Sequence, residues 1–296
     1  MTPSMCGSSS LFFGQVGDWT WEAVGAACDT DVYRARNAEG SPSYLSFYYF
    51  HTASRGALQP YGLTFGDELD VASRVFDFGS HSVLTLHRLS AAGTVGDDGA
   101  LDPVEFYERP RADCIYVENF NRWVSRSRAE SNQALIEAAP PEFRHAHLPR
   151  LPSAYSPRGV AGCARENGTF HPAGISGFDP GEQFVTRYEL DVVRDINGVG
   201  LVYFASYFSI VDTALLRLWR ELGRTDRAFR GRRLLDHRLG YFANADIESA
   251  FAITIRLWRS VTEPEHEIAD VSIRHAATGG LLAVASVETE LVGGAS

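Results

Sequence analysis

Residues 201–222 constrain the fold more than any other segment of this chain. They follow an Asn-Gly pair at Asn197 and Gly198, end at Gly223, and carry Arg217 and Arg220 near their C-terminal end, where a helix dipole favours cations. The pattern predicts a helix of about six turns, apolar on nearly every face over its first half. Such a helix cannot lie on a surface, so other structure must wrap it.

Strand patterns flank this helix on both sides. Residues 187–194 alternate apolar and polar side chains, as a strand with one buried face does. Four more strand patterns follow the helix, at residues 233–241, 250–261, 267–276 and 281–291. The last two are joined by a short hairpin connection at residues 277–280. The order predicts one long helix wrapped by a curved antiparallel sheet, which is the hot-dog arrangement.

The N-terminal half repeats this plan. Residues 9–28 form a mostly apolar segment that could be the equivalent helix, and strand patterns follow at residues 44–50, 68–76, 82–89 and 111–117. We therefore predict an α+β double hot-dog fold, with one unit over residues 1–152 and a second over residues 153–296. The Pro- and Gly-rich residues 149–180 would connect them. The alternative is one α+β domain without this duplication.

The charge of the chain limits its partners. With 296 residues, 45% of them hydrophobic, it can bury a sizeable core, and its net charge of −10 argues against a nucleic-acid or anionic-membrane surface. Residues 224–238 are locally basic, and we expect a solvated loop there. The opening residues lack a signal-peptide pattern, and the longest uncharged run within residues 195–223, residues 196–211, is too short to span a bilayer. The four cysteines form no CxxC pair, so we expect reduced thiols and a cytoplasmic protein.

The absence of lysine excludes several kinds of active site. All 27 basic residues are arginine, so a P-loop lysine, a pyridoxal phosphate Schiff base and a Ser-x-x-Lys nucleophile are impossible. The sequence also lacks GxSxG, HExxH, a helix-opening GxGxxG and a ladder of metal ligands. A reaction without metal or cofactor remains.

Two predicted helix starts are candidate sites. At the first, the backbone amides near Asn197, Gly198, Val199 and Gly200 could donate to a thioester oxygen, because a helix N-terminus offers unpaired N–H groups and partial positive charge. The alternative is an ordinary turn with an N-cap.

The second helix start, at residues 5–10, contains Gly7, Ser8 and Ser9, which could bind an anion. Cys6 could be a nucleophile there if the helix dipole favoured its thiolate. Capping of the helix by a serine is the simpler alternative.

A third candidate is the aromatic strand at residues 42–52. Strict alternation would place Tyr44 and Tyr48 on one face and Leu45, Phe47 and Tyr49 on the other. His51 follows in the same strand. Aromatic residues in strands usually pack in the core or on the sheet, so composition alone does not single out Tyr44.

Four long blocks of the sequence are similar to blocks of the LnmK-type family, the double hot-dog acyltransferase/decarboxylases of leinamycin-like polyketide pathways. They are MCGSSSLFFGQVGDWTWEAV (5–24), PSYLSFYYF (42–50), LTFGDELDVASRVFDFGSHSVLTLHR (63–88) and INGVGLVYFASYFSIVDTALLRLW (196–219). The resemblance implies an enzyme that decarboxylates methylmalonyl-CoA and delivers the propionyl group to the phosphopantetheine arm of an acyl carrier protein. It also implies a tyrosine nucleophile, which matches Tyr44, with Tyr48 as the other tyrosine on that strand face.

The implied chemistry needs no metal or cofactor. Loss of CO₂ from a malonyl-type thioester leaves an enolate whose oxygen needs preorganised donors, and one such donor is worth about 3 kcal/mol. A tyrosine hydroxyl, with an ordinary pKa of about 10, must lose its proton to a neighbour, and His51 or Asn197 is the expected support.

Other functions fit a hot-dog fold. A thioesterase would release free acid from acyl thioesters, a dehydratase would need a histidine and a carboxylate converging on the substrate, and a protein that only binds an acyl carrier protein would do neither. The expected partners are an acyl-CoA, an acyl carrier protein and, through a sheet edge, a second copy of the chain.

Overall fold

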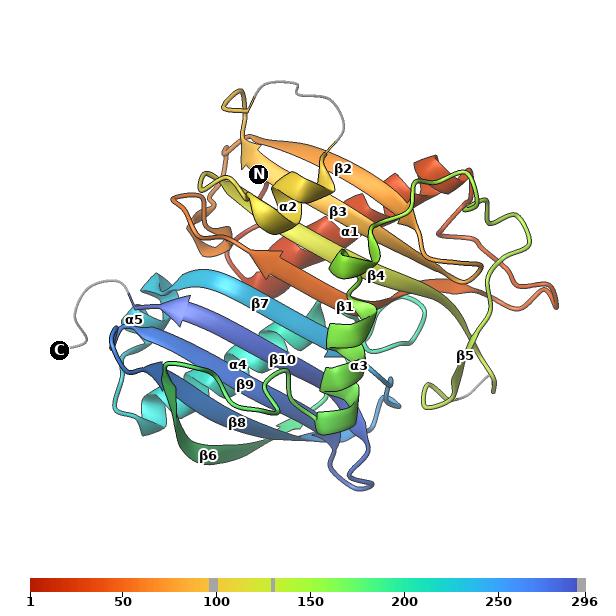
Figure 1. The fold of residues 1–296 in the computed structure, drawn as a ribbon. Coiled ribbons are helices and arrows are strands. Elements are labelled where there is room, and N and C mark those ends of the chain that lie inside the picture. Colours follow the sequence, from red (N-terminus) through yellow and green to blue (C-terminus); the bar gives the residue numbers. More distant parts are fainter. Residues whose placement is uncertain (96–100, 129–130, 292–296) are drawn as a thin grey trace.

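The computed structural model describes residues 1–95, 101–128 and 131–291, which build one ten-stranded antiparallel sheet with two long helices on one face (Figure 1). The helices are α1 (Ser9–Cys28), α2 (Pro103–Glu108), α3 (Arg158–Asn167), α4 (Ser206–Glu221) and α5 (Asp226–Gly231). The strands are β1 (Tyr44–Ala53), β2 (Leu69–Asp77), β3 (Ser82–Ala91), β4 (Cys114–Arg126), β5 (Leu135–Glu137), β6 (Phe178–Glu189), β7 (Arg233–Tyr241), β8 (Ala250–Ser260), β9 (His266–His275) and β10 (Leu281–Glu290).

The strand order shows the duplication. The sheet runs β2-β3-β4-β1-β7-β10-β9-β8-β6. In each half, the strand that follows the long helix lies at the centre of the sheet. The next three strands of the chain lie outward from it in reverse order, as β4, β3, β2 beside β1 and as β10, β9, β8 beside β7. The central strands β1 and β7 pair antiparallel and make the sheet continuous. Strand β6 precedes α4, and the described residues before α1 contain no counterpart to it. This is the predicted double hot-dog fold.

The two long helices share one core. The rings of Phe13 on α1 and Phe208 on α4 stack with centroids 4.3 Å apart, and both residues are fully buried. Helix α1 has the predicted bounds, but α4 begins at Ser206 rather than at residue 201. Leu201 and Val202 are buried without being helical. Among the described helices, none has the length and apolarity needed to cross a bilayer.

Strand β1 contains an irregularity that shifts its faces. Its pairing with β4 has a bulge between Phe47 and Tyr49, which makes Tyr48 an extra residue. Phe47 and Phe50 therefore both belong to the core beneath the helices, while Tyr49 packs in the cluster on the opposite face. The expectation that Tyr49 shares a face with Leu45 and Phe47 is wrong, because the bulge resets the alternation.

Two segments expected to be a connection and a loop contain helices, α3 in residues 149–180 and α5 in residues 224–238. Residues 149–180 include α3, which lies on the outer face of the sheet over β7 and β10 (Figure 1), and the start of β6. The boundary at residue 152 remains a prediction. Residues 224–238 are not a solvated loop, because Arg224 pairs with the buried Glu267 and Arg232 is itself buried against Asp212.

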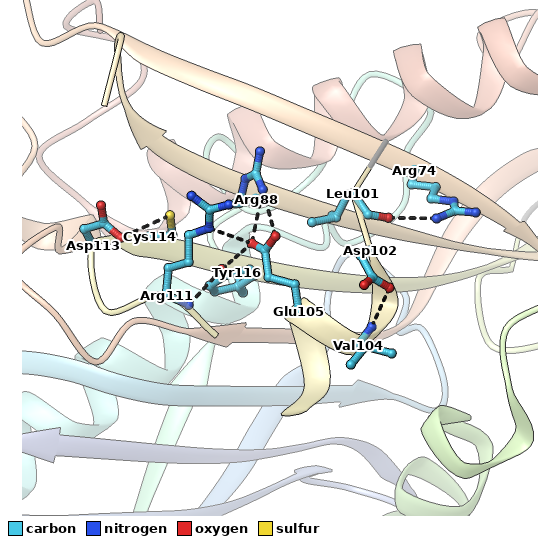
Figure 2. A network of polar contacts seen from close by, with 10 residues as sticks. All are labelled: Arg74, Arg88, Leu101, Asp102, Val104, Glu105, Arg111, Asp113, Cys114 and Tyr116. Carbon is cyan, nitrogen blue, oxygen red and sulfur yellow. Dashed lines mark hydrogen bonds and ion pairs between the residues drawn. The ribbon is translucent and has the colours of Figure 1, made fainter. Parts of the chain in front are cut away.

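Helix α2 is held on the outer face of the first half by a compact polar network (Figure 2). Glu105 of α2 accepts two hydrogen bonds from the Arg88 guanidinium, at 3.0 and 3.1 Å, and one from the Tyr116 hydroxyl at 2.7 Å. Arg111 lies 3.5 Å from the same carboxylate. Because one carboxylate joins α2 to β3 and β4, this network fixes α2 as a cover over the sheet.

Candidate active site

A cavity of about 260 Å³ lies where the start of β1 meets the segment that leads into α4. Among the residues that the structure describes, those that line it carry no charge and are mostly aromatic and aliphatic. The lining residues are Trp21, Val32, Tyr33, Tyr44, Leu45, Ser46, Phe47, Asn197, Gly198, Val199, Leu201, Val202, Tyr203, Phe204 and Asn244. The structure thus brings Tyr44 together with Asn197, Gly198 and Val199, although these candidates come from different halves of the sequence. We call this space the first cavity.

The turn at Asn197 is organised by its own side chain. The Asn197 Oδ1 accepts hydrogen bonds from the amides of Val199 (3.1 Å) and Leu201 (3.0 Å), and its backbone carbonyl accepts one from Gly200 (2.9 Å). Gly200 has a φ of 76°, which glycine adopts without strain. Within the described part of the chain, the Gly198 amide and the Asn197 side-chain NH₂ have no acceptor. Gly198 is exposed and Asn197 is half-buried, so solvent reaches both groups, and a ligand in the cavity would have to replace that solvent as their acceptor.

The sequence suggested that a helix begins at this turn, but the structure shows that it does not. Helix α4 starts at Ser206, and the amides of Ser206, Tyr207 and Phe208 donate to carbonyls three residues earlier. These bonds satisfy the first amides of α4 within the chain. The donors near Gly198 thus come from a side-chain-stabilised turn and not from a helix terminus.

Arg126 and Asn132 connect the parts of this site. Arg126, at the end of β4, donates to the Tyr44 hydroxyl at 3.2 Å, to the Val199 carbonyl at 2.6 Å and to the Asn132 Oδ1 at 2.9 Å. Asn132 is buried and donates to the Gly200 carbonyl at 2.7 Å. The guanidinium therefore fixes the tyrosine relative to the turn, and charge-assisted bonds of this kind are stronger than neutral ones.

A second cavity, of about 270 Å³, lies beside the first. Five residues line both: Ser46, Phe47, Val202, Phe204 and Asn244. Its remaining lining is polar and charged as well as aromatic, with Tyr48, Arg122, Val124, Gln133, Leu135, Glu137, Arg165, Tyr207, Tyr241, Phe242 and Ala243. Tyr48 thus lies in the second cavity and Tyr44 in the first. The Arg122 guanidinium stacks 3.9 Å from the centre of the Tyr48 ring.

His51 is not placed to support Tyr44. Its Nε2 lies 2.7 Å from Asp236 and its Nδ1 lies 3.6 Å from Glu118, and it lines neither cavity. Burial disfavours its charged form, but the charge of Asp236 and hydrogen bonds to Asp236 and Glu118 outweigh burial and raise its pKa to about 9. We expect a protonated, structural histidine, because two carboxylates enclose it.

The helix start near Gly7 lies outside the first cavity. Ser8 is the N-cap of α1 and accepts from the Leu11 amide at 3.4 Å, while Ser9 donates to Asp212 of α4 at 2.6 Å. The buried Cys6 donates to the Thr2 carbonyl. These contacts match the capping alternative.

Sequence reasoning missed Arg126, Asn132 and Asn244. Asn244 holds the segment before α4 by hydrogen bonds with both backbone groups of Val202, at 3.2 and 3.3 Å. None of the three belongs to a local motif, since only the sheet pairing and the packing of two loops bring them to Tyr44. A buried asparagine in a loop is a weak signal in a single sequence.

Solved structures share this fold over almost the whole chain. A putative oleoyl thioesterase from Lactobacillus plantarum has a TM-score of 0.58 at 10% identity, over 97% of this chain and 90% of that one. The 12:0-ACP thioesterase of Umbellularia californica has a TM-score of 0.56 at 12% identity, over 98% and 90%. An acyl-ACP thioesterase from Bacteroides thetaiotaomicron has a TM-score of 0.53 at 9% identity, over 96% and 90%. At these identities the likeness establishes the fold alone.

The sequence comparisons are more specific about descent. No curated protein matches the chain significantly. A family model described as the LnmK N-terminal Hot Dog Fold domain matches residues 1–172, which is more than half of the chain and includes all of α1, β1 and β4. The chain therefore belongs to the LnmK-type hot-dog family.

Proposed function

We propose that this protein decarboxylates a malonyl- or methylmalonyl-type CoA thioester and transfers the resulting acyl group to an acyl carrier protein. One observation carries the proposal: Tyr44, Asn197 and Gly198 line one cavity whose described lining residues carry no charge, and Arg126 joins the tyrosine to the turn. Membership of the LnmK-type family supports the substrate class. The residues proposed to act are Tyr44, Asn197 and Gly198, and the reaction uses no metal or cofactor.

The acyl transfer proceeds through an ester on Tyr44. The phenol oxygen attacks the thioester carbonyl, a C–O bond forms, and the C–S bond breaks with CoA leaving as its thiol after taking up the phenol proton. Arg126 holds the phenol oxygen 3.2 Å from its guanidinium and favours the charge that develops there. The thiol of the carrier arm then attacks the ester carbonyl and restores the tyrosine hydroxyl.

Decarboxylation breaks the bond between the α-carbon and the carboxylate. The electron pair moves into an enolate as CO₂ leaves, and protonation at the α-carbon completes the step. The Gly198 amide and the Asn197 side-chain NH₂ are the proposed donors to the enolate oxygen, since both lack an acceptor in the described chain. A preorganised donor is worth about 3 kcal/mol in a water-poor site, so these two reach that value only when the bound substrate excludes solvent from the exposed Gly198 and the half-buried Asn197.

The test uses methylmalonyl-CoA and a carrier protein bearing phosphopantetheine, with the mass of the carrier as readout. We expect propionyl-carrier from the wild type and a loss of at least about a hundredfold in transfer rate in Tyr44→Phe, because the variant lacks a nucleophile. Tyr155→Phe is the matched control, since Tyr155 bonds Glu108 away from both cavities. Undiminished transfer by Tyr44→Phe would remove this tyrosine from the mechanism.

The same assay separates the other functions. A thioesterase would produce free acid without labelling the carrier, and a carrier-binding protein would show complex formation without turnover. A dehydratase has less support, because the described residues that line the first cavity include neither a histidine nor a carboxylate.

A further inference from the structure

We propose that the second cavity binds the phosphorylated pantetheine arm of the substrate, while the first cavity holds the acyl group. The inference rests on the proposed function, because it assumes a thioester at the wall that the two cavities share. It assigns a role to Arg122, from β4, and Arg165, from α3 in the connecting stretch.

The two cavities differ in chemistry although they adjoin. Phe47 and Phe204 line both, and their rings stack with centroids 4.0 Å apart. On one side the described lining residues carry no charge, which suits an alkyl chain. On the other lie two arginines, the carboxylate of Glu137, a glutamine and three tyrosines, so the described lining keeps a net positive charge, which suits a chain of amides ending in a phosphate.

Polar groups in the second cavity lack partners in the described chain. Tyr207 is 2% exposed, and its hydroxyl makes no hydrogen bond. The Nε of Arg122 is also buried without a partner, although its Nη1 lies 3.2 Å from Glu137. Buried polar groups normally have a partner, and because these two belong to residues that line the cavity, a polar ligand bound there would be able to supply one. Arg165 is exposed at the edge of the cavity, where a phosphate could reach it while remaining partly solvated.

A different anion, the substrate carboxylate, would fit this cavity less well. The carboxylate of a malonyl-type thioester loses its charge as CO₂ departs. Arginines that bound it would stabilise the ground state more than the transition state and would slow the reaction. The phosphate keeps its charge throughout, so binding it costs nothing in the chemical step.

Calorimetry with free CoA tests the inference without requiring turnover. We expect Arg165→Ala to weaken CoA binding about five- to tenfold, the effect of losing one partly solvated charge-assisted contact. Binding of unphosphorylated pantetheine should not change. Arg227→Ala is the matched control, because Arg227 is an exposed arginine on α5 that lines neither cavity. The proposal fails if wild-type protein does not bind CoA, or if Arg165→Ala binds it as well as the control does.

Turnover of short thioesters separates the two possible anions. For methylmalonyl-N-acetylcysteamine, which has the carboxylate but no phosphate, we expect Arg165→Ala to leave KM and kcat unchanged. A raised KM for this substrate would place the carboxylate in the second cavity and overturn the proposal. If wild-type protein binds CoA through Arg165 but releases no CO₂ from either substrate, the proposed function fails and the arm site stands.

Discussion

His51 links the pH dependence of stability to the junction of the two halves. It lies on β1, opposite Glu118 of β4 on one side and Arg238 of β7 on the other, and its Nε2 is 2.7 Å from Asp236. With a side chain only 19% exposed and two carboxylates beside it, it has a pKa raised to about 9 from the ordinary value of 6.5. Replacement by glutamine removes this charge from the centre of the sheet.

The magnitude follows from the shift. Each unit of pKa corresponds to 1.36 kcal/mol, so protonated His51 contributes at most about 3 kcal/mol to the free energy of unfolding. Because the folded pKa lies above the unfolded one, this contribution is complete below pH 6.5. It decreases between pH 6.5 and 9 and is absent above that range. Wild type should therefore lose its advantage over His51→Gln as the pH rises.

Urea unfolding of both proteins at pH 6, 7.5 and 9.5 measures this difference. We expect a gap of about 2–3 kcal/mol at pH 6 that becomes small at pH 9.5, with similar m-values throughout. The comparison cancels titrations that the two proteins share. A gap that stays constant from pH 6 to 9.5 would refute the assignment of a protonated histidine between the two halves.

Two further pairs of variants test the packing of a helix glycine and the effect of burial on an ion pair. Gly17→Ala places a Cβ 2.1 Å from the Phe204 ring, which lines both cavities, so we expect a loss of about 1–3 kcal/mol in unfolding free energy together with slower thioester turnover. Gly162→Ala, inside α3, meets no described atom within 4 Å, so it should leave turnover unchanged and stabilise the protein by up to about 1 kcal/mol, and equal losses in the two variants would contradict the argument. Arg224→Ala leaves a buried carboxylate on β9 without its main partner and should cost about 3 kcal/mol in urea unfolding. The exposed ion pair of Arg220 should contribute less than about 1 kcal/mol, and equal losses in the two arginine variants would refute the role of burial.

The sequence predicts the helices and strands correctly where hydrophobic periodicity agrees with the residues that begin or end an element. Helix α1 and strand β7 have the bounds expected from the pattern, and β8, β9 and β10 differ from expectation by about one residue at their ends. The start of α4 is missed because Leu201, Val202 and Phe204 are as buried as the helix that follows. Hydrophobicity reports burial, and it does not distinguish a buried turn from a buried helix.

The candidate site is predicted only in part. Tyr44 and Asn197 are reached through family resemblance and through a turn signal, and the structure places both on one cavity. His51 is misjudged because neighbours in a sequence need not share a face or a cavity. Arg126 and Asn132 are missed because they reach Tyr44 and the turn through strand pairing and loop contacts, which a single sequence does not encode locally.

The extra residue in β1 has a practical consequence for engineering. Upstream of Tyr48 the strand presents one set of side chains to each layer, and downstream the phase is reversed. No substitution at Tyr48 restores a regular strand, because the irregularity is a matter of length and not of side-chain identity. Removing one residue there would turn either Tyr44 away from the first cavity or Phe50 out of the core beneath the helices. A design that moves this strand into another protein must therefore keep the strand and its extra residue together.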